Sequence, residues 1–527
     1  MTKTGKMGVL GLVLILGMSL QLVGCRKAAP EDAREFDVPV EGGILRVALG
    51  TDVPIFDSAY ASGLPNLGII HLVTEGLVKL DSETGNVIPH LAERWSVSDD
   101  GLVWTIKLRP NVKFHDGTAF DAQAVKFNID RLLNPDTKAL TRSFWQFIKE
   151  VKVVDPLTVD IITHDPFGPF MRQFTYAPMA MNSPTQVTKL GNEDYHTAPV
   201  GTGPFKFVEH VRGQHVKVVR NEEYWGGKPP LEGVVTAVMP EAGARIMALE
   251  TGEVDVAYHV PPRDVQRLEQ NPDIQVVYPP SQRIMHVGFN HNHGPLKDVR
   301  VRQALNYAVN KHEINQVILL GRAHVLDSPL PPTAFGYVPT MTYEFNPQKA
   351  KQLLQEAGYP GGFTIKLMYT PGRYLMDTEV VEAVQSYLAA VGVKVEIVSV
   401  EWAVQAAARR LPLAESTTEM YFLGWGCVTL DGDIGFQSFT TAAFAPGMNT
   451  MFYSNEEVDR LFLKGRQSVD PAERLAAYEP MQRLIMEDAP ILFLYVEPQI
   501  HAVRANARGV EISVNEMIFL DKAWLAR

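Results

Sequence analysis

The sequence predicts an α/β protein of about three lobes or domains. With 527 residues, the chain is too long for a single hydrophobic core. A strand pattern over 363–369, a helix pattern over 377–391 and a second strand pattern over 393–398 follow one another directly. That order predicts two parallel strands joined by a right-handed helical crossover. Residues 150–225 add strand-rich sequence, whereas 286–490 hold the clearest helix patterns.

Helix starts are the most explicit local signals. Asp298, Asn310 and Asn346 each precede apolar residues at helical spacing, and a Glu follows three residues after Asn310. Such residues accept hydrogen bonds from the free backbone amides of a first helical turn. Further helices are expected to begin near residues 121, 377, 455 and 470. A late apolar strand over 491–495 suggests that the chain finally returns to its first sheet.

The composition is that of an ordinary globular protein. The chain is 46% hydrophobic and 21% charged, which argues against overall disorder. Its net charge is −11, and no run of Lys and Arg forms a basic stripe. A general nucleic-acid-binding protein is therefore not expected.

The N-terminus predicts a bacterial secretory signal. Lys3 and Lys6 precede an uncharged apolar stretch from Met7 to Val23. Leu22-Val23-Gly24-Cys25 then matches a lipobox, which predicts a signal peptide over 1–24 and lipidation of Cys25. Residues 25–43 are polar and are expected to tether the lipid to the folded body. An uncleaved membrane anchor is the alternative.

The chain contains two cysteines. If Cys25 carries lipid, Cys427 has no partner and the fold uses no disulfide. Cys427 is then expected to pack as a small buried hydrophobe. A nucleophilic role is the alternative, and no nearby His supports it.

The stretch Met420 to Cys427 is the most suggestive of a ligand site. Its apolar run predicts a buried strand that ends in Trp425, flanked by Gly424 and Gly426. Glycines permit a sharp turn and a close approach by another surface. Two acids, Asp431 and Asp433, follow. An aromatic plate and carboxylates at a strand end suit a cleft, while a core Trp with a solvated acidic turn is the alternative.

Several short segments match one protein family in order and spacing. They are Glu75-Gly76-Leu77, Pro89 to Trp95, Ser98 to Gly101, Phe114 to Gly117, Gly201 to Phe205, Val299 to Leu305, Leu353 to Tyr359, and Tyr453 to Asn455 with Val458-Asp459. Together they resemble the extracytoplasmic solute-binding proteins of family 5, which serve peptide-type and nickel-type ABC importers.

The resemblance implies a two-lobed periplasmic-binding-protein (flytrap) fold with mixed sheets and an extra α/β domain. Hinge strands are expected near residues 286 and 490. The implied division is lobe I over 44–77, 199–286 and 491–527, the extra domain over 78–198, and lobe II over 287–490.

The resemblance also implies a function. A protein of this kind captures a small peptide-like solute between its lobes and presents it to the membrane permease subunits of an importer. We therefore expect an extracytoplasmic, lipid-anchored monomer that is not an enzyme and needs no cofactor.

The acids after Trp425 bear on the ligand. In dipeptide and oligopeptide members, an Asp three residues after the cleft Trp holds the ligand amine, and here that position is Val428. The acids come later, at Asp431 and Asp433, which resembles the glutathione-type members. Asp433 is the first candidate for pairing a ligand amine, and a solvated turn acid is the alternative.

A carboxylate partner and stacking residues complete the candidate site. Arg373 lies in the loop after the predicted strand 363–369, where ligands bind in open α/β sheets. It can hold a carboxylate in a bidentate pair, and a surface Arg is the alternative. Trp425, Trp402 and Tyr60 are candidates for stacking on the ligand.

Two other function classes stay open. His291 and His293 raise a nickel- or haem-binding member of the same fold, although residues two apart point to opposite faces of a strand. A secreted hydrolase is the third hypothesis. The chain has no Gly-x-Ser-x-Gly elbow, no His-Glu-x-x-His motif and no Rossmann glycine pattern.

Overall fold

A computed structural model describes residues 38–53, 55–60, 68–82, 84–176 and 179–526. The chain divides into two compact units, 1–39 and 40–527, and every element below belongs to the second. The predicted signal peptide and Cys25 lie outside the described residues. Within the described part, no helix is both long enough and apolar enough to cross a membrane.

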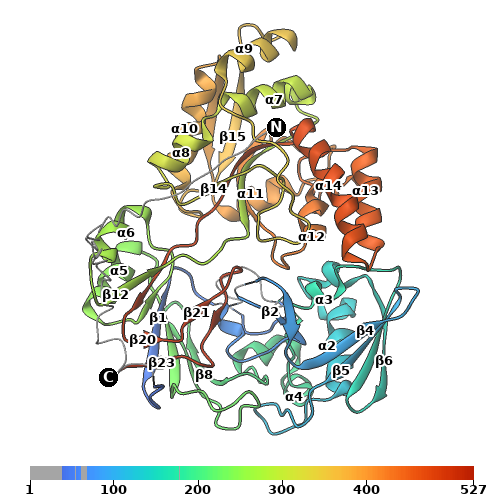
Figure 1. Ribbon diagram of the computed structural model, residues 1–527, viewed down its shortest axis with the longest axis vertical. Coiled ribbons are helices and arrows are strands. Elements are labelled where there is room, and N and C mark those ends of the chain that lie inside the picture. Colours follow the sequence, from blue (N-terminus) through green and yellow to red (C-terminus); the bar gives the residue numbers. More distant parts are fainter. Residues whose placement is uncertain (1–37, 54, 61–67, 83, 177–178, 527) are drawn as a thin grey trace, which may run out of the picture. The chain divides into compact units, whose positions relative to one another are not determined.

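The first lobe is built on a seven-stranded mixed sheet, in which segments from both ends of the chain lie side by side (Figure 1). The central strand β1 is parallel to β10 and β11, and its sequence ILRVAL is mostly buried. Helix α5 (Ala242–Thr251) ends at Gly252, as a left-handed C-cap requires, and α6 spans Pro262–Glu269. In sheet order the strands are β12 (Ile274–Val277), β19 (His501–Arg504), β11 (Val256–Ala257), β1 (Ile44–Leu49), β10 (Gly233–Val238), β9 (His215–Arg220) and β8 (Phe205–Val211).

The second lobe is built on a six-stranded sheet. Its β15–α10–β16 unit pairs the two strands in parallel, which confirms the prediction for residues 363–398. Strand β17 is antiparallel to β13 along its whole length and carries Trp425 near its end. In order, the strands are β14 (His324–Val325), β18 (Ile491–Val496), β13 (Arg283–Phe289), β17 (Met420–Gly426), β15 (Phe363–Tyr369) and β16 (Val393–Ser399).

Helices of the second lobe begin where the sequence predicted. Asp298, Asn310, Asn346, Asn455 and Asp470 each accept a hydrogen bond from a backbone amide of the helix that follows. These helices surround the sheet in the upper part of Figure 1. They are α7 (Val299–Ala308), α8 (Lys311–Val317), α9 (Pro347–Glu356), α10 (Asp377–Ala389), α11 (Trp402–Arg409), α12 (Gly432–Phe436), α13 (Glu456–Gln467) and α14 (Pro471–Asp488).

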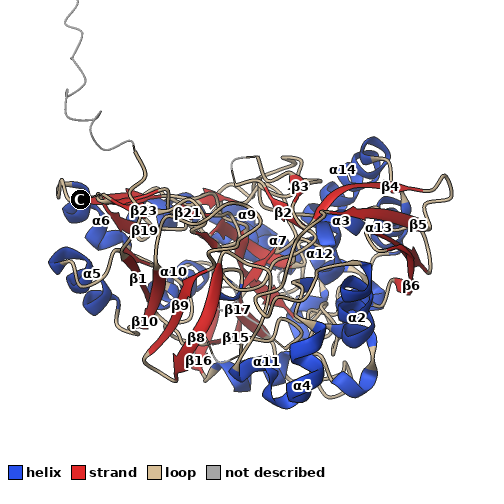
Figure 2. Cartoon of the chain, turned by 90° about the horizontal axis from the view of Figure 1, so that it is seen from below, coloured by secondary structure: helices blue, strands red, loops and turns tan. Residues whose placement is uncertain are grey.

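A third sheet of four antiparallel strands has its own apolar core. Helix α2 (Ala122–Leu133), capped by Asp121 as predicted, packs on it beside β6 and β7 (Figure 2). The sheet order is β4 (Ala92–Val97), β5 (Val103–Leu108), β7 (Thr158–Thr163) and β6 (Ile148–Asp155). Shorter elements nearby are β2 (Val78–Leu80), β3 (Val87–Pro89), α3 (Phe170–Gln173) and α4 (Pro184–Asp194).

Two chain segments connect the seven-stranded and six-stranded sheets, one from β12 to β13 and one from β18 to β19. They run together, because the Glu497 amide donates to the Arg283 carbonyl at 2.9 Å and the Gln499 side chain donates to the Pro280 carbonyl at 2.9 Å. The connections lie close to residues 286 and 490, where the resemblance placed the hinge.

One sequence-based prediction about the last large strand is wrong. Residues 491–496 do form a strand, but it pairs with β13 and β14 in the second lobe. The chain returns to its first sheet only at β19. Every residue of β18 is buried, and a run buried on both faces fits the interior of either sheet. After β19, the chain ends in two short pairs, β20 (Ala507–Arg508) with β23 (Trp524–Leu525) and β21 (Glu511–Ile512) with β22 (Ile518–Phe519).

Candidate functional site

A cleft of about 910 Å³ is lined by residues of both lobes. This volume is in the range of small-molecule sites. The first lobe contributes the end of β1 with Arg245 and residues 258–261, and the second contributes Arg283, residues 372–379 and the end of β17. The connecting segment 497–500 also lines it. A solute bound here would therefore contact both lobes and the segment between them.

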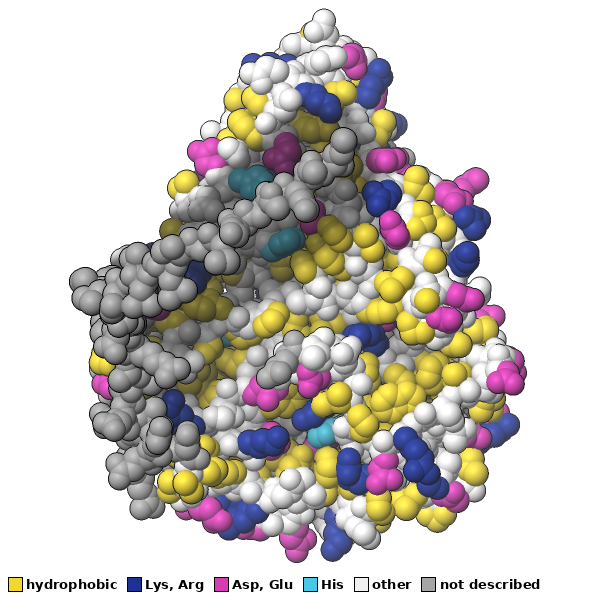
Figure 3. Space-filling view, viewed as in Figure 1, with side chains coloured by type: hydrophobic (Ala, Val, Ile, Leu, Met, Phe, Trp, Pro, Cys, Tyr) yellow, Lys and Arg dark blue, Asp and Glu magenta, His cyan; other side chains and the backbone are white. Residues whose placement is uncertain are grey.

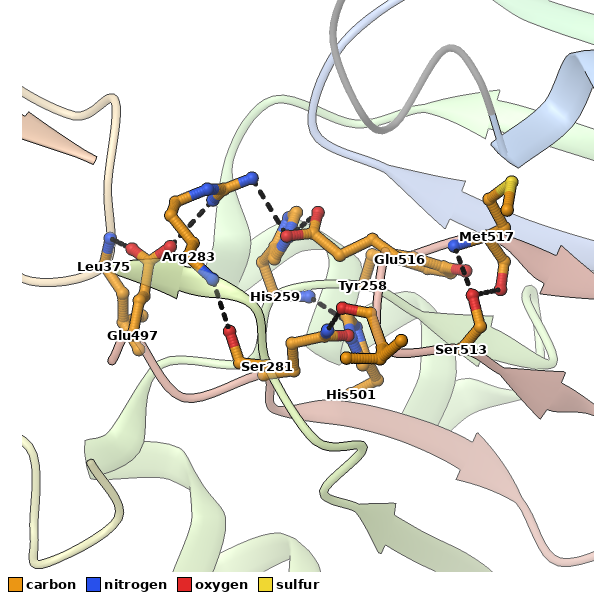
Figure 4. Close-up of polar contacts among 12 residues, drawn as sticks. Tyr258, His259, Ser281, Arg283, Leu375, Glu497, His501, Ser513, Glu516 and Met517 are labelled. Carbon is orange, nitrogen blue, oxygen red and sulfur yellow. Dashed lines mark hydrogen bonds and ion pairs between the residues drawn. The ribbon is translucent and has the colours of Figure 1, made fainter. Parts of the chain in front are cut away.

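An ion-pair cluster crosses from one lobe to the other inside the cleft (Figure 4). Arg283, on β13, lies between Glu497 at 2.7 Å and Glu516 at 3.0 Å. Glu516 belongs to the C-terminal segment whose next residues, Met517 and Ile518, are buried in the first-lobe core. Arg283 thus connects the second lobe to the first through its ion pair with Glu516, which requires the two lobes to keep their alignment.

The Glu516 carboxylate is held in its charged form. Burial would raise its pKa, but the charge of Arg283 and the hydrogen bond from His259 together lower it well below its usual value. His259 lies 3.3 Å from Glu516, and both residues have left-handed backbones, with φ of 54° and 62°. Such a conformation is costly for a residue other than glycine and clusters at functional sites.

The loop that carries Arg373 is fixed by a buried carboxylate. Asp377, at the first position of α10, accepts hydrogen bonds from the backbone amides of Gly372 at 3.1 Å and Tyr374 at 2.9 Å. The guanidinium of Arg373 stacks on the Trp402 ring, 3.4 Å from its centroid. No carboxylate among the described residues pairs with Arg373. Its charge is thus exposed to the cleft and available to an anionic ligand group.

Glycines beside Trp425 allow close packing rather than a turn. Strand β17 continues through Gly424 and Gly426, and neither has a positive φ. A Cβ at Gly424 would lie 2.6 Å from the Tyr374 ring and 2.9 Å from Arg283 Cδ. The expected sharp turn is wrong, and the close contacts occur at the glycine backbone, so a close approach to the Trp425 indole itself stays a prediction. The glycine lets two cleft residues pack directly on the strand.

A smaller cavity of about 240 Å³, here called the side pocket, lies within the second lobe. Arg373, Trp402 and Trp425 all line it, and Arg373 lines the main cleft as well. The structure thus brings together three of the six candidate ligand residues at one place, at the junction of the two cavities.

The other three candidates lie elsewhere. Asp431 is buried in a bidentate pair with Arg474, at 2.6 and 3.0 Å, and also faces Arg172. Asp433 is buried beside Arg466 and accepts a hydrogen bond from Gln437. Burial raises the pKa of Asp433, while the Arg466 charge opposes that shift.

Tyr60 donates to the Thr137 carbonyl and packs against the core beside the four-stranded sheet. None of these three lines the cleft or the side pocket. Their ligand roles remain predictions, and of the three only Asp433 lines a further cavity, one of about 750 Å³ among the described residues.

Val428, the position at which the resemblance implies an Asp in dipeptide-type members, lines the cleft. Cys427 is fully buried and unpaired, as expected, and burial raises the pKa of its thiol. His291 is half-buried, 3.4 Å from the Pro490 carbonyl, and His293 faces Glu419 at 3.7 Å. Among the described residues, no group of three or more His, Cys, Asp or Glu is placed to hold a metal ion.

Sequence reasoning missed the Arg283 cluster. Arg283 lies at the start of an otherwise apolar strand, and Glu497 follows another. A charged residue next to a strand buried on both faces is the one signal that could have identified them. Glu516, in contrast, lies in a polar C-terminal segment with no pattern that indicates a cleft.

The family model for bacterial extracellular solute-binding proteins, family 5, matches residues 86–446. The chain belongs to this family. It is therefore a solute-binding protein with the two-lobed fold and not an enzyme, and it acts outside the cytoplasm.

Relatives in this family include glutathione-binding proteins named GsiB. That of Pectobacterium atrosepticum is 33% identical over 482 residues, which cover 90% of this chain and 93% of the relative. That of Escherichia coli O157:H7 is 32% identical over 473 residues, covering 88% and 91%.

Solved structures of other binding proteins have the same fold. The periplasmic binding protein DppA of Helicobacter pylori, in complex with the peptide STSA, has a TM-score of 0.82 at 27% identity and covers 93% of this chain and 99% of its own. NikZ of Campylobacter jejuni, in complex with Ni(L-His), has a TM-score of 0.77 at 25% identity and covers 89% and 96%.

Proposed function

We propose that this family 5 protein binds small peptides or glutathione-like compounds in the cleft between its lobes and delivers them to an ABC importer. The observation that carries the proposal is the unpaired Arg373, which is stacked on Trp402 at the cleft. A guanidinium of this kind suits a ligand carboxylate. The full-length similarity to glutathione-binding relatives points to the same ligand class.

The cleft also offers less to a free ligand amine than the resemblance implies for dipeptide-type members. Val428 offers no charge to a free amine, and each carboxylate of Glu497 and Glu516 already faces Arg283. An amine would have to share those acids with the arginine. We therefore infer that ligand carboxylates contribute more to affinity than the ligand amine.

The experiment is a calorimetric titration of the purified protein with glutathione, a dipeptide and a tripeptide, and with nickel–histidine as the competing class. We expect binding of at least one peptide-like ligand with a Kd of roughly 0.1–10 μM, equivalent to about −7 to −10 kcal/mol. Binding of nickel–histidine alone would contradict the proposal and favour the metal carrier that the similarity to NikZ raises.

We further propose that Cys25 carries the lipid that anchors the protein to the membrane, with residues 25–43 as the tether. Replacing Cys25 with Ser should move the protein from the membrane fraction to the soluble fraction. Retention on the membrane would instead indicate an uncleaved N-terminal anchor. We expect the released protein to elute as a monomer in size-exclusion chromatography.

The domain division is proposed in the same way. Residues 78–198 would form the extra domain and 44–77 with 199–282 most of lobe I, because the predicted bound of 286 falls inside β13, a strand of the second-lobe sheet. The pairing of β18 with β13 supports ending lobe II at Val496 rather than at residue 490. Limited proteolysis should then cut first near the boundaries of 78–198 and not within its four-stranded sheet.

A further inference from the structure

The side pocket contains three arginines and no acid. Arg373, Arg409 and Arg410 line it, and none of its lining residues is Asp or Glu. This is unusual in a chain whose net charge is −11. Over the face drawn in Figure 3, by contrast, side chains of both signs are interspersed. The pocket thus concentrates positive charge in a cavity with apolar walls, which strengthens its field.

Arg409 is the most informative of the three. Its side chain is 8% exposed, and its Nε is buried without a hydrogen-bond partner. Its guanidinium lies over the rings of Tyr421 at 5.1 Å and Trp402 at 5.6 Å, and no carboxylate of the described residues pairs with it. A buried charge without a counter-ion is costly to keep. A ligand anion would supply the missing partner.

The other polar groups of the pocket do not neutralise this charge. His286 is buried at the back with its Nδ1 unpartnered. Burial, together with the charge of Arg409, lowers the pKa of His286 to about 3, so this side chain stays neutral. The hydroxyls of Tyr421 and Thr450 hydrogen bond with each other at 2.6 Å. The side pocket thus offers hydroxyl and imidazole groups but no negative charge, and a counter-ion for Arg409 would have to come from the solute.

The size of the pocket limits what can enter. Its volume of about 240 Å³ is about a quarter of the 910 Å³ of the main cleft. The side pocket therefore suits one end of a solute whose remainder occupies the larger space. The rest of the solute would lie in the main cleft, which Arg373 also lines.

We propose that the side pocket binds a second carboxylate of the solute through Arg409, while Arg373 holds the first at the junction with the cleft. The transported solute is then a compact peptide-like diacid. This inference rests on the proposed function and narrows it from small peptides to those with two acidic groups, the class that includes glutathione.

The test compares glutathione with its two monoethyl esters, each of which lacks one carboxylate charge. Calorimetry is done on the unaltered protein, on Arg409→Met, on Arg373→Gln and on Arg460→Gln, a control whose exposed side chain pairs only with Glu457. We expect the unaltered protein to bind each ester at least about tenfold more weakly than the diacid.

In Arg409→Met, the penalty for one of the two esters should fall to within about threefold, and in Arg373→Gln the penalty for the other should fall likewise. The Arg460→Gln control should keep both penalties. If Arg409→Met still binds both esters much more weakly than the diacid, the pocket does not bind a carboxylate. The inference is then overturned, although the proposed function stands.

Thermal unfolding of the ligand-free protein separates binding from folding. Because Arg409 has no counter-ion, Arg409→Met should leave the Tm unchanged or raise it, whereas a structural arginine would lower it. If the unaltered protein binds no peptide at all, the proposed function fails, and glutarate serves as the probe. Glutarate should then raise the Tm of the unaltered protein but not of Arg409→Met, and no shift in either would overturn the inference.

Discussion

Two arginine-rich regions, one around Asp431 and one in the side pocket, differ in how their charges are balanced. Around Asp431, Arg474 forms a bidentate buried pair, and Arg172 approaches the same carboxylate while it donates to the Gly85 and Leu430 carbonyls. In the side pocket, Arg373 and Arg409 face no acid.

The difference separates structural charges from binding charges. Arg172 lies in α3, whereas Arg474 lies on α14, so the Asp431 junction joins parts of the chain far apart in sequence. An arginine that is already paired with a carboxylate of the protein has few donors free to bind a ligand. Unpaired guanidinium groups in a cavity remain able to bind a ligand anion, but keeping them there without a counter-ion lowers the stability of the fold.

Breaking the Asp431 junction should give the largest effect. Arg474→Met leaves the Asp431 carboxylate buried without its main partner and should lower the free energy of unfolding by about 3–5 kcal/mol. Urea unfolding followed by circular dichroism measures it. The double variant Asp431→Leu/Arg474→Met should recover most of the loss. A loss below about 1 kcal/mol in the single variant would show that the junction is not structural.

Removing the cleft arginine should affect binding and not folding. Arg373→Gln deletes a charge-assisted bond worth roughly 1.5–3 kcal/mol, so a carboxylate-bearing ligand should bind about 10–150-fold more weakly. The Tm of the free protein should not change, because the side chain is exposed. Lys394→Gln, which removes an exposed positive charge on β16 away from the cleft, is the control. Equal affinities in all three proteins would remove Arg373 from the site.

The ion pair between Arg283 and Glu516, which links the lobes, should weaken at acid pH. The lowered pKa of Glu516 means that its ionised form stabilises the fold above the unfolded-state pKa of about 4.5, and that this stability is lost as the pH falls below it. The loss approaches about 1.4 kcal/mol per pH unit. Glu516→Gln should therefore flatten the pH dependence of unfolding below about pH 4.5. An unchanged slope would mean that Arg283 and Glu516 are not coupled in solution.

The smallest effect is expected at Asp433. Its carboxylate is 2% exposed beside Arg466 and lines neither the cleft nor the side pocket. Asp433→Asn should change ligand affinity by less than about threefold. A tenfold or larger loss for an amine-bearing peptide, but not for its N-acetyl form, would instead return Asp433 to the ligand site.

Local signals in the sequence predicted the elements well, and less so their partners. Asp298 and Asn310 cap helices because capping depends on residues a few positions apart. The prediction that β18 belongs to the first sheet is wrong because an apolar sequence does not specify which strands it pairs with. At the site, Arg373 and Trp402 could be proposed from their loop and helix positions. Arg409 could not be proposed, because its lack of a counter-ion follows from the tertiary structure, which places no Asp or Glu in the side pocket.

The central claim is that two lobes close on a solute whose carboxylates replace the missing partners of the cleft arginines. A crystal structure of the protein grown with glutathione tests it most directly. We predict the ligand between the lobes, with one carboxylate on Arg373 and the other on Arg409. Glutathione bound elsewhere, with both arginines still unpaired, would contradict this account.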